Sequence, residues 1–157
     1  MKVIILNGPM GVGKTAVGKY IAEATPGTAF IDGDWCLDIH PFIGNRETKT
    51  MAVDNILHMI ENYKMIVLVW LMDQAWVYDS IIEGIKKLGL EIKSLTLTCS
   101  KATLTDRWQN DKVCPWRTDD WLKISTDSLP YFSTLDNTLD TSNLSIKEVA
   151  EKIMTTE

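Results

Sequence analysis

Residues Gly8 to Thr15 read G-P-M-G-V-G-K-T, and the interpretation of the whole chain starts from this stretch. It matches the pattern G-x-x-x-x-G-K-[ST] of a phosphate-binding loop. In such a loop the glycines let backbone N–H groups turn toward a polyphosphate, the lysine ammonium reaches the outer phosphates, and the hydroxyl is a ligand for Mg²⁺. We therefore expect nucleotide contacts along the loop and from the next residue: Gly8, Pro9, Met10, Gly11, Val12, Gly13, Lys14, Thr15 and Ala16.

The neighbouring segments have the order that this motif requires. Val3–Leu6 is an apolar run that indicates a buried strand. After the loop, Val17, Ile21 and Ala24 follow one another at helical spacing, and Pro26 ends the pattern. A helix that starts here directs the positive end of its dipole toward a bound anion.

Composition places the chain among ordinary globular proteins. Its 157 residues predict a single domain over 1–157. The net charge of −5 and the sequence pI of about 5.0 argue against nonspecific binding to nucleic acid. We expect no membrane segment, because no apolar run approaches the ~20 residues of a span. We also expect no signal peptide and, from three cysteines without C-x-x-C spacing, a reduced cytoplasmic protein.

Strand and helix patterns alternate along the chain, which predicts a parallel sheet with right-handed crossovers. The further strands are expected at Thr28–Asp32, Met65–Trp70, Ile92–Cys99 and Asn137–Asp140. The further helices are expected at Glu47–Asn62, at Gln74–Leu88, from a Ser100 cap to Asn110, from Thr118, and after a Ser145/Glu148 capping box.

Two carboxylates follow the second strand, in Ile31-Asp32-Gly33-Asp34. The carboxyl ends of parallel strands meet at the crevice where ligands bind in open sheets. One carboxylate there could hold a water bound to Mg²⁺, and the other could accept the proton of an acceptor hydroxyl. The alternative is a solvated turn, since Asp-Gly pairs are common turn formers.

At this point the chain resembles the P-loop small-molecule kinases: the shikimate kinase, gluconate kinase and nucleotide kinase group. Besides the loop, the resemblance is carried by the D-G-D string, by Arg107 with Arg117, and by Asp140-Thr141-Ser142. It implies an α/β, three-layer P-loop NTPase fold with a short lid. The five-stranded parallel sheet would have the order 2-3-1-4-5, with helices on both faces.

The resemblance also implies roles for single residues. Asp32 would be tied to the metal together with Thr15, and Asp34 would act on the substrate. Arg107 would stack on adenine, and Arg117, in a lid at about 111–118, would close over the phosphates. Arg46 stands in the region that binds substrate in this group. For each arginine the alternative is a surface ion pair, for example Arg107 with Asp111 at i,i+4.

Two further residues near the crevice are open to more than one interpretation. Trp35 follows the D-G-D string and could line an acceptor pocket together with Trp70, although core packing is the default for a tryptophan. Asp73 is either an acid that orients Mg²⁺ or the cap of the helix that starts at Gln74, and we favour the cap.

These features predict an ATP-dependent phosphotransferase that uses Mg²⁺ and moves the γ-phosphate to a hydroxyl of a small molecule. Lys14, Asp34 and Arg117 are the expected catalytic residues, in a monomer or a homodimer. The alternatives are a nucleotide-binding ATPase and a regulatory module without an acceptor. A GTPase switch is disfavoured because neither N-K-x-D nor D-x-x-G occurs. The acceptor stays open: no glycine triplet follows the third strand, and no arginine follows Arg117.

Overall fold

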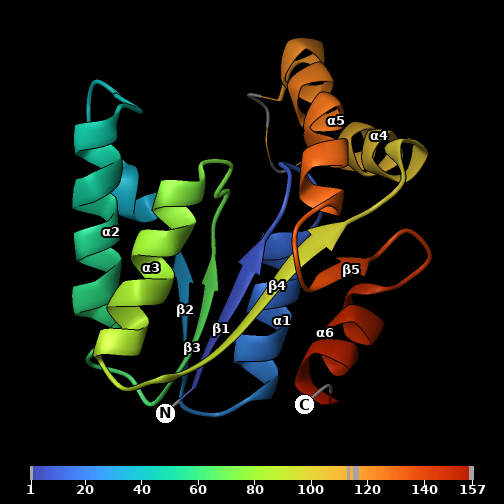
Figure 1. The fold of residues 1–157 in the computed structure, drawn as a ribbon. Coiled ribbons are helices and arrows are strands. Elements are labelled where there is room, and N and C mark those ends of the chain that lie inside the picture. The colour runs from blue at the N-terminus through green and yellow to red at the C-terminus, as the bar shows by residue number, and fades with distance from the viewer. Residues whose placement is uncertain (1, 113, 115–116, 156–157) are drawn as a thin grey trace.

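The computed structural model describes residues 2–112, 114 and 117–155 and contains one five-stranded sheet. All neighbouring strands are parallel, in the order β2-β3-β1-β4-β5. The strands are β1 Lys2–Asn7, β2 Thr28–Asp32, β3 Met65–Val69, β4 Glu91–Thr98 and β5 Thr138–Asp140. This confirms the predicted fold class and strand order (Figure 1).

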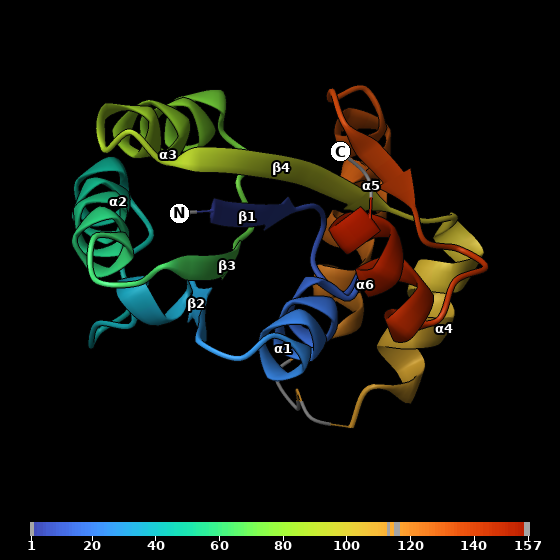
Figure 2. The same cartoon turned by 90° about the horizontal axis from the view of Figure 1, so that it is seen from below.

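Helices cover both faces of the sheet, as Figure 2 shows from below. The elements are α1 Lys14–Ala24, α2 Arg46–Ile60, α3 Ala75–Lys87, α4 Lys101–Asn110, α5 Asp119–Ser133 and α6 Ile146–Thr155, with a 3-10 turn η1 at Trp35–Leu37. Helices α2 and α3 pack on one face, and α1 and α6 on the other (Figure 2). None of the described helices has both the length and the apolar character that crossing a bilayer requires.

The central strands are buried on both faces because their residues alternate between two apolar clusters. Val3 and Ile5 pack toward α2 and α3, whereas Ile4 and Leu6 pack toward α1 and α6. All four are fully buried.

Helix α1 approaches the sheet closely because Gly18 has no side chain. A Cβ at this position would lie 2.6 Å from Cγ1 of Val69 and 2.9 Å from Cε2 of Phe30. The start of α1 directly follows the glycine loop, so this contact helps to set the direction of the helix that leaves the loop.

We expect Gly18→Ala to destabilise the protein, although the same change in an open helix would stabilise it by about 1 kcal/mol. The reason is that Val69 and Phe30 must move to admit the methyl group, which costs about 1–3 kcal/mol in a packed interior. Urea unfolding measures the difference. Glu23→Ala, at an exposed position of the same helix, is the control and should change stability by less than about 0.5 kcal/mol. A gain in stability for Gly18→Ala would contradict this account.

Candidate functional site

The glycine loop joins β1 to α1 and wraps around the side chain of its own lysine. Gly13 is the N-cap of α1 with a φ of 110°, a left-handed conformation that favours glycine. The Lys14 ammonium donates hydrogen bonds to the carbonyl oxygens of Gly8 at 2.7 Å and Pro9 at 2.9 Å. The first turn of α1 and the Lys14 ammonium thus offer positive charge at the same place, as an anion site requires.

The pKa of Lys14 is lowered to about 8, and burial of the ammonium is the main cause. The nearby charges of Asp34 and Asp32 oppose this shift by raising the pKa, and the charge of Arg117 adds to it by lowering the pKa. Four charged groups from three parts of the chain therefore act on one another at the carboxyl edge of the sheet. The structure brings together Lys14, Asp32, Asp34 and Arg117, as the sequence predicted.

Side chains from distant parts of the chain hold the loop from outside. Ser125 of α5 donates to the carbonyl of Met10 at 2.6 Å, and Arg107 of α4 donates to the carbonyl of Val12 at 2.8 Å. The Trp108 ring lies against Gly11, where a Cβ would come within 2.9 Å of the ring. Sequence reasoning missed Ser125, because a lone serine in a helix gives no signal of its partner.

Asn7 is a second residue that sequence reasoning missed. It is the last residue of β1, and only 1% of its surface is exposed. Its Oδ1 accepts hydrogen bonds from the backbone N–H of Gly8 at 2.8 Å and of Met72 at 2.9 Å, and its Nδ2 donates to the carbonyl of Met72 at 3.2 Å. Asn7 therefore ties the start of the loop to the segment that follows β3.

The D-G-D string lies beside the loop, with its two carboxylates in different surroundings. The backbone N–H of Asp34 donates to Oδ1 of Asp32 at 3.1 Å. Burial is the main cause that raises the pKa of Asp32, and the charge of Asp34 raises it further, while the Asp34 backbone N–H, Lys14 and a hydrogen bond with the Thr15 hydroxyl lower it. The Thr15 hydroxyl therefore lies near the Asp32 carboxylate.

The donor set of Thr15 and Asp32 fits Mg²⁺ chemically. Mg²⁺ prefers oxygen ligands and is usually bound by one or two protein groups, by waters and by substrate phosphates. Among the described residues, no group of three or more histidine, cysteine and acidic side chains could hold a metal ion. A Mg²⁺ ion at this place would therefore take its remaining ligands from phosphate and water.

Arg107 lies at the other side of the loop, where it joins α4 to the segment after β5. Its Nη1 donates to Oγ1 of Thr141 at 2.9 Å and its Nη2 to the carbonyl of Thr141 at 2.7 Å. Arg107, which is predicted to stack on adenine, thus lies beside the Asp140-Thr141-Ser142 string that carries part of the family resemblance. The alternative ion pair of Arg107 with Asp111 is not what the structure shows, since Asp111 pairs with Arg117.

Arg117 is held near the loop by that ion pair and by an aromatic ring. Its guanidinium lies over the Trp108 ring, 4.9 Å from the centroid. Trp108 also contacts Gly11, so the ring connects Arg117 to the loop. Of the predicted lid at about 111–118, positions 113, 115 and 116 lie outside the described residues.

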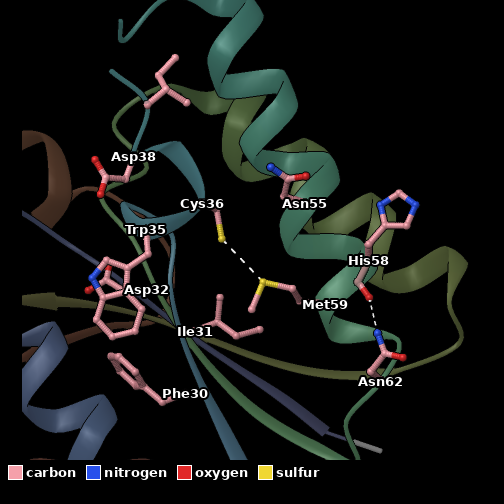
Figure 3. Close-up of a pocket in the computed structure, with 11 residues that line it drawn as sticks. Phe30, Ile31, Asp32, Trp35, Cys36, Asp38, Asn55, His58, Met59 and Asn62 are labelled. Atoms are coloured by element: carbon pink, nitrogen blue, oxygen red, sulfur yellow. Dashed lines mark hydrogen bonds between the residues drawn. The ribbon is translucent and has the colours of Figure 1, made fainter. Parts of the chain in front are cut away.

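Trp35 and Arg46 do not meet in one pocket. Trp35 is 62% exposed, packs edge-to-face on Phe30, and lines a groove of about 660 Å³ beside the edge strand β2 (Figure 3). The groove runs between β2 and α2, with Asp32 at its margin. Arg46 begins α2 and stacks on Trp76 of α3, 4.9 Å from the ring centroid. Neither Arg46 nor Asp34 is among the residues that line this groove.

The prediction that Asp73 caps the third helix is wrong. Gln74 is the N-cap residue of α3, and no side chain makes a capping hydrogen bond there. The Asp73 carboxylate instead forms an ion pair with Lys49 of α2, with an Nζ–Oδ1 distance of 3.7 Å. The ammonium on the neighbouring helix provides a charged partner that the local sequence around Asp73 does not reveal.

Comparisons with known proteins agree with this architecture. A family model described as an AAA domain matches residues 4–119, and the chain belongs to this family. A comparison with curated protein sequences found no match.

Several solved structures share the fold over nearly the whole chain. The tunicamycin resistance protein of Deinococcus radiodurans is 21% identical to this chain, with a TM-score of 0.69. The match covers 97% of this chain and 92% of the resistance protein. A gluconokinase from Sinorhizobium meliloti is 18% identical, with a TM-score of 0.70. The match covers 97% of this chain and 89% of the gluconokinase. The shikimate kinase from Acinetobacter baumannii, in complex with shikimate, is 22% identical, with a TM-score of 0.64 and coverages of 97% and 90%. The fold of this chain is therefore that of the P-loop small-molecule kinases.

The lowered pKa of Lys14 predicts how the stability of the site depends on pH. Between about pH 8 and the ordinary lysine value of 10.5, the folded protein has lost this proton and the unfolded chain still holds it. The unfolded state then binds more protons, so the free energy of unfolding rises with pH in this window. We therefore expect the unfolding free energy of wild type, relative to that of Lys14→Met, to increase from pH 7 to pH 10.

Urea unfolding at steps of one pH unit measures this trend. Other groups that titrate in the range are common to both proteins and cancel in the difference. If the difference in unfolding free energy between the two proteins stayed constant from pH 7 to pH 10, the pKa of Lys14 would not be lowered in the folded protein.

Proposed function

We propose that this protein is an ATP-dependent phosphotransferase that moves the γ-phosphate of Mg·ATP to a hydroxyl group of a small molecule. One observation carries the proposal: the ends of β1 and β2 bring the Lys14 ammonium, the Thr15 hydroxyl and the two carboxylates of the D-G-D string into one interacting group. Phosphoryl transfer depends mainly on such positioning and charge stabilisation. The gluconokinase and shikimate kinase among the structural neighbours support the same reaction class.

In this proposal the nucleotide lies along the glycine loop. The loop and its first helical turn, Gly8 to Ala16, bind the phosphates, with Lys14 on the outer ones. Thr15 and Asp32 would hold Mg²⁺, whose charge would neutralise the phosphates. Arg107 lies beside the adenine, and its hydrogen bonds to Thr141 fix the plane on which a base can stack. Arg117 stabilises the phosphoryl group in transfer from the far side of the loop.

Asp34 acts on the acceptor. It takes the proton of the acceptor hydroxyl as that oxygen forms a bond to the γ-phosphorus. The bond from this phosphorus to the bridging oxygen breaks, and ADP leaves with the electron pair. Asp34 is assigned this role because Asp32 lies near the Thr15 hydroxyl, the other proposed ligand of the metal.

The acceptor is placed on the side of the D-G-D string that faces the starts of α2 and α3. Arg46 and Trp76 stand there as a stacked pair, and Lys49 and Asp73 stand there as an ion pair. Trp35 lies on the other side of the string, against Phe30. We therefore propose Arg46 as a substrate contact on the side of Asp34, and the predicted contact of Trp35 with the acceptor is not part of this placement.

A panel of acceptors tests the proposal by release of ADP from Mg·ATP. The panel contains gluconate, shikimate and tunicamycin, chosen from the names of the structural neighbours, together with neutral sugars and nucleosides. The proposal expects at least one compound to raise ADP release above the rate in water alone. Tight ATP binding without transfer to any compound would favour a regulatory module, and rapid turnover that no compound changes would favour an ATPase.

The two carboxylates of the D-G-D string should differ in their effects. We expect Asp34→Asn to lower the rate of acceptor phosphorylation by about 10²-fold, the usual scale of a general base, with little change in affinity for Mg·ATP. Asp32→Asn should instead raise the Mg²⁺ concentration needed for half-maximal rate by at least about tenfold. Asp79→Asn, at an exposed position of α3, is the control. If both D-G-D variants phosphorylated an acceptor normally, the string would be a turn without a catalytic role.

A further inference from the structure

Trp70 lies at the point where β1, β3 and the D-G-D string meet. It directly follows β3, the strand that separates β1 from β2, and it is only 3% exposed. Its backbone N–H donates to the carbonyl of Leu6 in β1 at 3.2 Å, and the backbone N–H of Gly33 donates to the carbonyl of Val69 at 2.9 Å. The backbone of Trp70 is therefore tied to the strand that carries the loop, and the D-G-D string is tied to the end of β3 directly before it.

Gly33, the glycine of the D-G-D string, lies in close contact with this indole. A Cβ at Gly33 would lie 2.2 Å from Cγ, 2.4 Å from Cδ2 and 2.6 Å from Cδ1 of Trp70. These atoms belong to a buried ring that has no room to move aside. The position therefore requires glycine for packing, and any larger residue would displace either the ring or the string.

The indole ends in a hydrogen bond to the carboxylate that the proposed function uses. Nε1 of Trp70 donates to Oδ1 of Asp34 at 3.1 Å. An indole N–H is only a donor and does not titrate, so this bond has one direction at every pH. It occupies one carboxylate oxygen from the protein interior and leaves Oδ2 to accept a proton from outside.

We propose that Trp70 is a positioning residue that holds Asp34 for the acceptor hydroxyl, an inference that rests on the proposed function. The ammonium of Lys14 attracts the Asp34 carboxylate, and an ion pair between them would remove both groups from their roles. The indole N–H competes with that attraction without adding charge. Orientation of one carboxylate oxygen toward the reacting hydroxyl is the contribution that such a contact makes to the rate.

The test uses Trp70→Phe, which keeps an aromatic ring and removes the N–H. Transfer from Mg·ATP is measured with water and with each compound of the acceptor panel. We expect kcat to fall at least about tenfold, while the dissociation constant for Mg·ATP stays within about threefold. The double variant with Asp34→Asn should be no slower than Asp34→Asn alone, because the indole N–H can assist catalysis only when a carboxylate is present to be positioned. Trp121→Phe, at an exposed position of α5, is the matched control.

A second measurement reads the hydrogen bond itself and needs no acceptor. In the full chain labelled with ¹⁵N-tryptophan, the Trp70 indole signal is assigned by its loss in Trp70→Phe. Asp34→Ala, which removes the acceptor atom, should shift this signal and speed its exchange with solvent, and it should leave the Trp121 indole signal unchanged. This arm decides the geometry even if Trp70→Phe is too unstable to assay, since Asp34 is exposed and its replacement is mild.

The outcomes separate this inference from the function on which it rests. If Asp34→Asn is slow but Trp70→Phe turns over normally, Trp70 has only a structural role and the inference is wrong. An unchanged indole signal in Asp34→Ala would also overturn it. If Asp34→Asn itself transfers phosphate at the normal rate, the role assigned to Asp34 fails, and this inference fails with it.

Discussion

The buried ammonium of Lys14 is the group around which the rest of this site is arranged. Burial of a cation is costly, and the lowered pKa of Lys14 records that cost. Two loop carbonyls and the charges of Asp32 and Asp34 offset it in part, while Arg117 opposes them. A polyphosphate in the loop would supply negative charge at the same place. Because the positive charge of the Lys14 ammonium is only partly compensated in the free protein, the site favours an anionic ligand.

The loop is held by side chains that belong to other parts of the fold. Asn7 fixes its first residue to the segment after β3, Ser125 binds the carbonyl of Met10 from α5, and Arg107 binds that of Val12 from α4. Helices α4 and α5 flank the segment that carries Arg117. Rigid support of this kind is what positions charged groups for catalysis.

Local sequence patterns were sufficient for the architecture. The apolar runs, the glycine loop and the Ser145/Glu148 capping box all depend on neighbours within a few residues, and the structure shows each of them. The strand order came from the family resemblance. The placement of Asp32 and Asp34 beside Lys14 followed from the rule that parallel strands end at one edge.

The residues that sequence reasoning missed have partners far away along the chain. Asn7 and Met72 are 65 positions apart, and Ser125 and Met10 are 115 positions apart. Asp73 was misjudged for the same reason, because its partner Lys49 comes from another helix. Trp70 was expected at the crevice, but its hydrogen bond to Asp34 depends on how closely Gly33 lets the indole approach. Such contacts are set by tertiary packing, which a single sequence does not encode in a readable pattern.

The most direct test of this account is calorimetric titration of the protein with Mg·ATP at pH 8 in two buffers of different ionisation enthalpy. If Lys14 receives the phosphates, binding raises its pKa, and the complex takes up protons from the buffer. Since the free Lys14 has a pKa of about 8, uptake should approach about half a proton per nucleotide bound. Binding with no proton uptake, or no binding at millimolar Mg·ATP, would contradict the claim that this loop and its buried lysine form a nucleotide phosphate site.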